Sequence, residues 1–385
     1  MSEPFISSAS LHDFSLWKRM ELKRLPFLFD LEITARCNLN CRHCYINLPA
    51  GDKAAEKKEL SLEEVREIVD EAVSLGALWC IVTGGEPLLR DDFLDIYFYL
   101  KKKGLLVTIF TNATLVNAEH IRVFKRFPPR DIEVSVYGTS AGTYEKITRR
   151  PGSFAAFRRG FELLLKSGFN VRLKAMTMRS NVHEHHEIAR FCRQRTHDFY
   201  RFDPFLHLRY DRDPERNREI RSERLTPQEI VSLEQSDPER FQALQEKCDK
   251  SVMPESSSAE IGQLFLCGAG KASYSISYDA MFRLCASLWH PDCVYDLRQG
   301  DLTDAWRHFV QRVRGMSSQR EEYLRSCRVC DLMNLCMWCP AHAYLETGQL
   351  DAPVEYFCQV AHARAQALGA AERSSPSPRI EVNFL

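Results

Sequence analysis

Three absences limit what this 385-residue chain can be. It has no excess of either charge, because 52 Lys and Arg residues balance 52 Asp and Glu residues. General nucleic-acid binders usually carry a basic excess, so that class is disfavoured. The chain has no run of about 18 apolar residues, and its first segment, MSEPFISSASLHDF, lacks the apolar stretch of a signal peptide. We therefore expect a cytoplasmic protein with neither a membrane partner nor a nucleic-acid partner.

Cysteine is the residue type that stands out, with 14 copies. In a reducing compartment they are not expected to form disulfides. Seven of them gather in two short segments, Cys37–Cys44 and Cys327–Cys339, and such spacing is typical of metal or iron–sulfur binding. Cys80 and Cys192 instead fall within a predicted strand and a predicted helix, where we expect them to be small buried hydrophobes.

The first two-thirds of the chain alternates short apolar runs with amphipathic helical segments. The predicted strands cover residues 27–33, 79–82, 105–110, 132–136, 171–176 and 199–205. Such alternation implies a parallel sheet with crossover helices. Six units fit an α/β fold of the partial (β/α)6 TIM-like barrel kind or an open doubly wound sheet. In either fold the loops after the strands carry the active site.

The pattern divides the chain into five segments. They are an N-terminal extension (1–26), a core domain (27–225), a helical bridge (226–265), a small cysteine-rich domain (266–365) and a tail (366–385). We interpret the charged stretch 209–224 as a solvated connector, with a substrate-contacting insertion as the alternative. One helix is expected over 226–250, and His183, His185 and His186 are interpreted as surface residues.

The first cysteine segment directly follows the first predicted strand. Cys37, Cys41 and Cys44 can reach one small metal centre. A [4Fe–4S] cluster normally takes four cysteines, so three leave one iron open to a reactive ligand. Zinc with His43 as fourth ligand is the alternative. This CxxxCxxC segment, with Thr83-Gly84-Gly85-Glu86-Pro87 after the second strand, resembles the signature of radical S-adenosylmethionine (SAM) enzymes.

The resemblance implies further contacts with SAM. The residues that it assigns to SAM binding are Tyr45, Gly84, Gly85, Glu86, Asn112, Ser135 and Arg149. The glycine turn is expected to approach the methionine part of SAM closely, while Asn112 and Ser135 follow later strands and are expected to meet the ribose hydroxyls. Arg149 is expected to pair with the SAM carboxylate, and Arg150 is an equal candidate for that role.

The later cysteines resemble the SPASM extension, which typically holds two auxiliary [4Fe–4S] clusters. The resemblance implies an outer cluster on Cys327, Cys330, Cys336 and Cys358 and an inner one on Cys267, Cys285 and Cys339. Cys293 is the best candidate for the fourth inner ligand, Cys248 is a weaker one, and an open iron is a further alternative. The chain departs from the family at the two-residue gap before Cys339 and at Ala280, where a glycine is usual. Structural zinc sites remain the alternative for the array.

The same resemblance implies radical chemistry, in which an electron from the first cluster splits SAM and a 5′-deoxyadenosyl radical attacks a C–H bond. A peptide or protein substrate is expected, with a thioether or carbon–carbon crosslink as product. Ala286 replaces the aspartate of sulfatase-maturating members. Expected partners are a flavodoxin- or ferredoxin-like one-electron reductant and a separate leader-peptide-binding protein, because the 1–26 extension is too short for that domain. The alternatives are a small substrate such as a tetrapyrrole and a non-enzymatic zinc-stabilised binding module.

Overall fold

The computed structural model describes residues 23–195, 201–249 and 262–369. They divide into two compact units. One contains the chain up to Arg224 together with Phe265–Gly315, and the other contains Leu225–Leu264 together with the chain from Met316. Within the described residues, no helix is long and apolar enough to cross a membrane.

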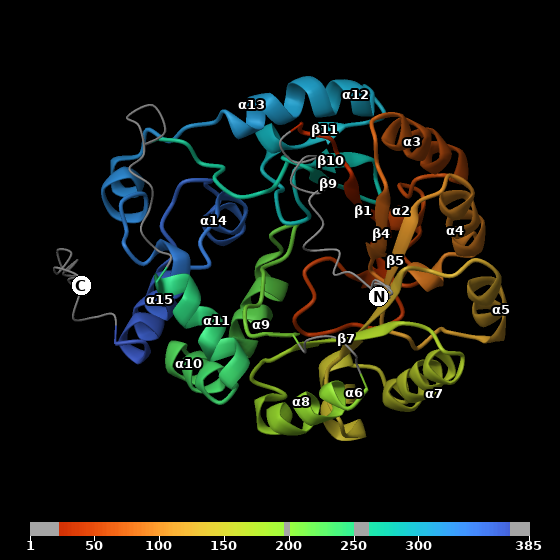
Figure 1. Ribbon diagram of the computed structural model, residues 1–385, viewed down its shortest axis with the longest axis horizontal. Helices are drawn as coiled ribbons and strands as arrows, with labels where there is room; N and C mark the ends of the chain where they lie inside the picture. The colour runs from red at the N-terminus through yellow and green to blue at the C-terminus, as the bar shows by residue number, and fades with distance from the viewer. Residues whose placement is uncertain (1–22, 196–200, 250–261, 370–385) are drawn as a thin grey trace, which may run out of the picture. The chain divides into compact units, whose positions relative to one another are not determined.

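A nine-stranded curved sheet forms the centre of the first unit (Figure 1), in the order β11-β10-β9-β1-β4-β5-β6-β7-β8. The strands are β1 (Leu28–Thr34), β4 (Trp79–Gly84), β5 (Leu106–Thr111), β6 (Asp131–Val136), β7 (Val171–Met176), β8 (Arg201–Asp203), β9 (Ser273–Ile276), β10 (Met281–Arg283) and β11 (Tyr295–Asp296). The run from β9 through β1 to β8 is parallel throughout. The six predicted strands are present, although the last is shorter than 199–205, and positions 199 and 200 lie outside the described residues.

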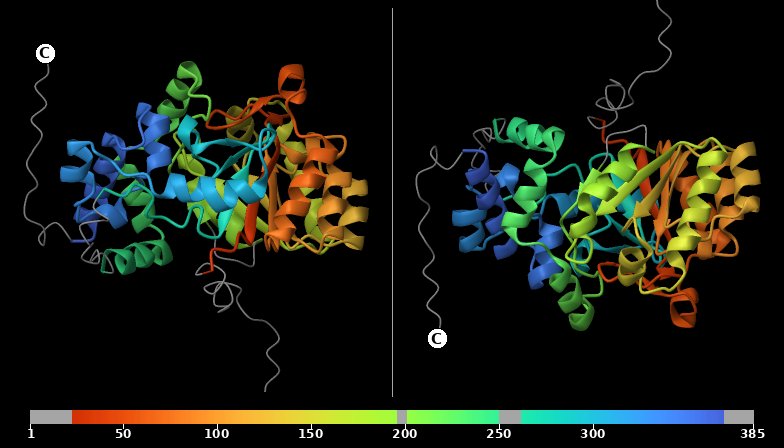
Figure 2. Two further views of the ribbon diagram at one scale, coloured as in Figure 1. Left: turned by 90° about the horizontal axis from the view of Figure 1, so that it is seen from above. Right: turned by 90° about the horizontal axis from the view of Figure 1, so that it is seen from below.

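Helices cover the outer face of this sheet (Figure 2), as right-handed crossovers between parallel strands require. In this unit they are α2 (Lys53–Glu56), α3 (Leu62–Ser74), α4 (Phe93–Lys102), α5 (Ala118–Arg126), α6 (Ala141–Thr148), α7 (Ser153–Lys166), α8 (His185–Arg193), α9 (Pro214–Glu223), α12 (Leu302–Asp304) and α13 (Val310–Arg314). A capping box at Ser61 and Glu64 begins α3, with both reciprocal hydrogen bonds.

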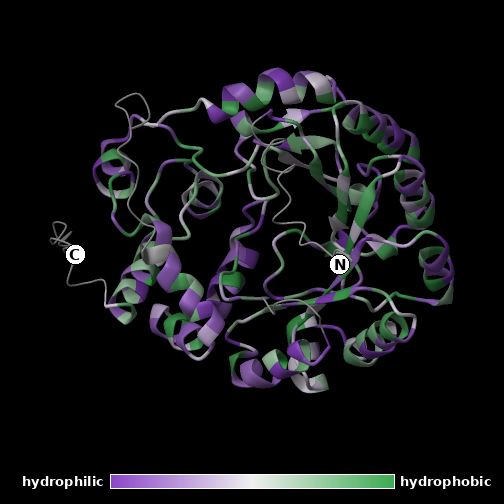
Figure 3. Cartoon of the chain, viewed as in Figure 1, coloured by the Kyte–Doolittle hydropathy of each residue, from purple (hydrophilic) through white to green (hydrophobic). Residues whose placement is uncertain are grey.

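The core lies between the strands and these helices. Leu31, Val82 and Ile109 stand side by side in register on β1, β4 and β5, and each is at most 1% exposed. Figure 3 shows the apolar colouring concentrated on the strands, whereas the helices carry mixed colouring. Each such side chain contributes about 1.5–3 kcal/mol on burial, so this layer holds the strand ends in fixed positions. Cys80 and Cys192 are both fully buried, as predicted.

Strands β9–β11 extend the barrel sheet, which the sequence did not predict. β9 pairs in parallel with β1, and Tyr274 on β9 stacks on Phe29 with ring centroids 5.5 Å apart. Arg283 on β10 forms a fully buried ion pair with Glu32 on β1. The segment Phe265–Gly315 therefore belongs to the barrel unit, whereas the sequence analysis placed Phe265 in the helical bridge and the rest of the segment in a separate cysteine-rich domain.

The second unit is helical and loop-rich. Its helices are α10 (Pro227–Gln235), α11 (Pro238–Asp249), α14 (Pro340–Thr347) and α15 (Glu355–Ala367). The prediction of one helix over 226–250 was wrong, because Pro238 cannot donate a helical hydrogen bond and starts a new helix. Arg364 on α15 donates to Glu234 on α10 and to the Leu335 carbonyl. This buried contact fixes the two helices and the cysteine loop together.

Candidate functional site

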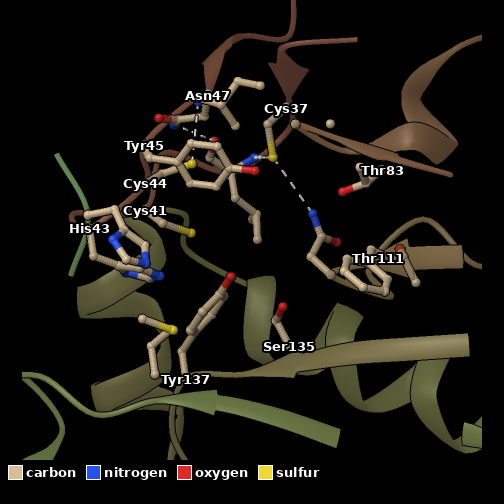
Figure 4. Close-up of a pocket in the computed structure, with 18 of the residues that line it drawn as sticks. Cys37, Cys41, His43, Cys44, Tyr45, Asn47, Thr83, Thr111, Ser135 and Tyr137 are labelled. Atoms are coloured by element: carbon tan, nitrogen blue, oxygen red, sulfur yellow. Dashed lines mark hydrogen bonds between the residues drawn. The ribbon is translucent and has the colours of Figure 1, made fainter. Parts of the chain in front are cut away.

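A cavity of about 260 Å³ lies at the carboxyl ends of the parallel strands. It is the site that a parallel α/β sheet predicts for a ligand. Eight of the residues that the resemblance assigned to the cluster or to SAM line it, and these are Cys37, Cys41, Cys44, Tyr45, Gly84, Gly85, Asn112 and Ser135. Figure 4 shows three labelled cysteines on one side and Ser135 with Tyr137 facing them across the cavity.

Two of the three cysteines in the first loop accept backbone hydrogen bonds at their sulfur atoms. The backbone N–H of Leu39 donates to Cys37 Sγ at 3.4 Å, and that of Asn47 donates to Cys44 Sγ at 3.3 Å. Burial raises the pKa of Cys37 and that of Cys41, so both thiols stay protonated at neutral pH until iron displaces the proton. Donors aimed at sulfur favour thiolate ligation and influence the potential of an iron–sulfur cluster.

The C-terminal end of helix α6 holds the cysteine loop in place through two backbone hydrogen bonds. The backbone N–H of Asn40 donates to the Thr148 carbonyl at 2.9 Å, and that of Arg42 donates to the Ile147 carbonyl at 3.0 Å. Carbonyls at a helix C-terminus lack helical partners, so the loop satisfies them. The cysteines therefore sit on a backbone that other elements hold in place.

The Gly84-Gly85 turn packs against the segment that leads into Cys37. Gly85 N–H donates to the Thr34 carbonyl at 2.7 Å, and a Cβ at Gly85 would lie 2.3 Å from the Arg36 carbonyl oxygen. Gly84 has φ +135° and faces Thr34 equally closely. The sequence analysis attributed these glycines to the approach of a ligand. The structure adds a second reason, because the neighbouring backbone occupies the space of their side chains.

Glu86 supports the site from behind. Its carboxylate accepts hydrogen bonds from Thr111 Oγ1 and the Asn112 backbone N–H, both at 2.7 Å. Burial raises the pKa of Glu86 to about 7, against the opposing effect of these hydrogen bonds. Asn112 is thereby held with its side-chain amide 3.8 Å from Cys37 Sγ. Glu86 thus positions the end of β5, and its assignment as a SAM contact stays a prediction.

Tyr137 is a lining residue that the sequence analysis did not assign to the site, and it lies beside His43, which that analysis named as an alternative zinc ligand. Tyr137 lies within hydrogen-bonding range of both Cys41 and Ser135, and its ring meets that of His43 edge-on at 5.0 Å. His43 Nδ1 is buried with no hydrogen-bond partner among the described residues, and burial lowers the pKa of His43 to about 4. A neutral imidazole and a phenol therefore line the cavity beside the thiols. For Tyr137, its position directly after β6 was the available signal.

Two further lining residues come from the last strand. Asp203 ends β8, and its carboxylate accepts the Phe205 backbone N–H at 2.9 Å. His207 follows four residues later and also lines the cavity. They extend the polar lining beyond the strands that carry the predicted SAM contacts.

The structure bears on three interpretations of the surrounding polar residues, and it revises two of them. Arg149 lies outside the cavity lining and forms an ion pair with Glu219, so its predicted contact with the SAM carboxylate stays a prediction. The stretch 209–224 is not simply a solvated connector, because Arg209 is only 3% exposed and donates to Asn47 in the cysteine loop. His185 is 4% exposed beside Thr177, so its assignment to the surface was wrong.

The later cysteines fall in both units. In the second unit the thiol of Cys327 lies within electrostatic range of Cys330, Cys336 and Cys358, and burial raises the pKa of Cys327 to about 12. Cys339 caps α14 by accepting the His342 backbone N–H. In the first unit Cys293 is fully buried within electrostatic range of Cys285, whereas Cys267 is exposed. The side chain of Cys248 lies outside the described residues.

The donor sets were tested for their fit to iron–sulfur clusters. In residues 23–195, 201–249 and 262–369, no three Cys, His, Asp or Glu side chains converge tightly enough to hold a single metal ion. The first loop nevertheless places three thiols around one cavity and supplies N–H donors to two of the sulfurs. This donor set fits a three-cysteine cluster with one iron facing the cavity.

Sequence comparison identifies the core of this fold. Residues 31–193 match the Radical SAM superfamily. The chain carries a radical SAM enzyme domain. The superfamily uses SAM and a [4Fe–4S] cluster, in agreement with the resemblance seen in the cysteine motif. This finding does not support the alternative of a non-enzymatic zinc-stabilised module.

Relatives of this radical SAM chain include proteins with different substrates. AdoMet-dependent heme synthase of Methanosarcina barkeri is 24% identical over 347 residues, which cover 84% of this chain and 93% of that protein. The subtilosin biosynthesis protein AlbA of Bacillus subtilis is 30% identical over 170 residues, which cover 44% of this chain and 37% of AlbA. Other curated relatives are likewise matched over less than half of their length.

The fold itself resembles solved radical SAM structures. Streptococcus suis SuiB bound to its precursor peptide SuiA superposes with a TM-score of 0.63 at 15% identity, covering 91% of this chain and 82% of SuiB. At this identity the likeness concerns the fold alone. It confirms the predicted partial-barrel α/β architecture.

Proposed function

We propose that this radical SAM enzyme oxidises a C–H position of a peptide or protein substrate. The observation that carries the proposal is the single cavity that joins Cys37, Cys41 and Cys44 to the polar ends of β4, β5 and β6. A [4Fe–4S] cluster on these thiols would supply the electron that cleaves SAM to the 5′-deoxyadenosyl radical.

The protein's own residues would bind and orient SAM in this cavity. Tyr45, Gly84, Gly85, Asn112 and Ser135 would contact it, because all five line the cavity beside the thiols. Glu86 would act indirectly through its hydrogen bond to Asn112. The walls of this cavity would limit the access of water to a reactive radical, which otherwise attacks whatever is nearest.

Two auxiliary clusters are part of the proposal. Cys327, Cys330, Cys336 and Cys358 would hold the outer one, which agrees with their mutual electrostatic range in the second unit. Cys267, Cys285, Cys293 and Cys339 would hold the inner one. These clusters would accept the electron that the substrate loses after hydrogen abstraction, so that the net change is a two-electron oxidation.

The peptide substrate is supported by the relatives with similar architecture. The fold of SuiB, solved with a precursor peptide, spans nearly the whole chain, and AlbA is named for the biosynthesis of a bacteriocin. A peptide maturase of this kind would draw electrons from a flavodoxin- or ferredoxin-like protein, and a separate leader-binding protein would present the peptide.

A tetrapyrrole is the second candidate substrate. The specific observation in its favour is the match to a heme synthase, which extends over 84% of this chain and nearly all of that protein. Decarboxylation of a propionate side chain is also a two-electron oxidation at a C–H position. The same site would therefore serve it with a different substrate pocket.

The two candidates are separated by their products. Anaerobic enzyme with SAM and dithionite would be offered short peptides encoded beside its gene and, separately, iron coproporphyrin. The peptides would carry deuterium at their C–H positions. A peptide that loses two hydrogens, with deuterium transferred to 5′-deoxyadenosine, supports the maturase. Loss of carbon dioxide from the porphyrin supports the second candidate, and a colourless protein without iron contradicts both.

A further inference from the structure

The segment from Asp203 to Arg224 connects the last barrel strand with the loop after the first, and we call it the strap. It leaves β8, contributes Leu206 and His207 to the cavity, and then crosses to the cysteine loop, where Tyr210 N–H donates to the Tyr45 carbonyl at 3.1 Å. Helix α9 in Figure 1 is its second half. Because β8 and β1 are not paired in the sheet, the strap closes the barrel at the site.

Arg209 is the buried anchor of the strap. Its Nη1 donates to the Asn47 backbone carbonyl at 3.1 Å and to Asn47 Oδ1 at 3.3 Å. Its other side forms a bidentate ion pair with Asp211, whose oxygen lies 2.6 Å from Nη2. Asn47 is the residue whose N–H donates to Cys44 Sγ. Asn47 therefore links the Arg209 guanidinium to the Cys44 thiol, and the guanidinium lies within electrostatic range of that thiol.

Arg216 holds the other end of the same loop. Its Nη2 donates to the Cys41 carbonyl at 3.0 Å and to Asn47 Oδ1 at 3.3 Å. The guanidinium also lies within electrostatic range of the Cys41 thiol. Arg216 thus contacts the backbone of Cys41, and Arg209 contacts Asn47, which donates to Cys44.

Among the described residues, Arg42, Arg149, Arg209 and Arg216 form one network of ion pairs with Asp211, Glu219 and Glu223. Arg209 and Arg216 are the members of this network that also donate to the cysteine loop. Buried ion pairs contribute little net stability compared with apolar packing, so guanidinium groups held this close to the thiols need a reason other than stability. A negatively charged cluster that becomes more negative on reduction supplies one.

We infer that Arg209 and Arg216 are positioning residues that fix the cluster loop and raise the reduction potential of the cluster on Cys37, Cys41 and Cys44. Fixing follows from the donated hydrogen bonds, and the potential follows from Coulomb attraction between the guanidinium groups and the reduced cluster. The inference rests on the proposed cluster but not on any substrate. It gives the charged strap a role that neither a solvated connector nor a substrate-contacting insertion would have.

The test is a potentiometric titration of the anaerobic holoenzyme, followed by EPR. The signal of this cluster is the part of the spectrum that is absent from the C37A/C41A/C44A variant. We expect Arg216→Gln and Arg209→Gln to shift its midpoint to more negative potential. At the wild-type midpoint the ratio of reduced to oxidised cluster should fall about tenfold, which corresponds to 59 mV for one electron.

Two controls separate charge from structure. Arg218→Gln removes an exposed arginine from the same helix and should leave the midpoint unchanged. Arg216→Lys keeps the charge but loses the fork geometry, so it should retain the wild-type midpoint with less cluster iron. If Arg216→Gln fails to hold the cluster, the two single variants Arg209→Gln and Arg216→Lys are compared instead. Arg209→Gln should then show the shifted midpoint and Arg216→Lys the wild-type midpoint.

An unchanged midpoint in the glutamine variants with full cluster iron would overturn the inference, and so would an equal shift in Arg218→Gln. Failure of the proposed function looks different. In that case C37A/C41A/C44A retains the same iron and the same EPR spectrum as the wild type.

Discussion

Replacing Gly85 by alanine tests how the turn after β4 meets the cysteine loop. The new Cβ would lie 2.3 Å from Arg36 O, 2.5 Å from Ala35 O and 2.7 Å from Arg36 C. All three are backbone atoms, so no side chain can rotate away, and either the turn or the segment before Cys37 must shift. Overpacking of this kind costs about 1–3 kcal/mol. Because the turn and the loop line the same cavity, we expect SAM affinity to fall about tenfold or more, since about 1.4 kcal/mol is tenfold.

Gly142→Ala is the matched control. A Cβ at Gly142 would meet nothing within 4 Å, and the residue lies in helix α6. Alanine there should stabilise the protein by about 0.5–1 kcal/mol through helix propensity. The assays are urea unfolding followed by circular dichroism and SAM binding by calorimetry. Wild-type stability and affinity in Gly85→Ala, or equal losses in Gly142→Ala, would refute the steric reasoning.

Three further predictions concern other parts of the chain. Burial raises the pKa of Glu86 from 4.5 to about 7, so the stability that protonated Glu86 contributes is full below about pH 4.5 and is lost as pH rises through 7. Glu86→Gln should therefore flatten the dependence of the urea-unfolding free energy on pH between pH 5 and 8. An unchanged slope of unfolding free energy against pH would contradict the shift. Arg364→Ala removes one of the two arginine partners of buried Glu234 and leaves Arg240 as the other, so it should cost about 1.5–3 kcal/mol in urea unfolding, and wild-type stability would rule this out. If Cys327 and Cys339 serve different clusters, each alanine variant should lose about four iron atoms and the double variant about eight; a loss of four in the double variant would place both on one cluster.

Local signals made the order of the barrel elements predictable. The Ser61 capping box begins α3, and the switch between strand and helix periodicity marks where the barrel strands end and their helices begin. These features depend on residues close in sequence. The three cysteines of the first loop were equally readable, because their chemistry and spacing are local and place them in one cavity.

Other features depend on contacts between distant segments. Strands β9–β11 have only two to four residues each, too few for a periodic pattern, and their place beside β1 comes from the Arg283–Glu32 pair and aromatic stacking. Burial of Arg209 was equally hidden, because a charged stretch reads as solvated unless its partner, here Asn47, is known. Likewise, the need for glycine at position 85 comes from Arg36 in another segment.

The central claim is that Cys37, Cys41 and Cys44 hold the cluster that cleaves SAM. Its most direct test compares wild type with C37A/C41A/C44A, both prepared anaerobically, by counting iron and measuring 5′-deoxyadenosine formed from SAM and dithionite. The account predicts about 12 iron atoms and deoxyadenosine for the wild type, against about eight and none for the variant. Deoxyadenosine formed by the variant at the wild-type rate would contradict it.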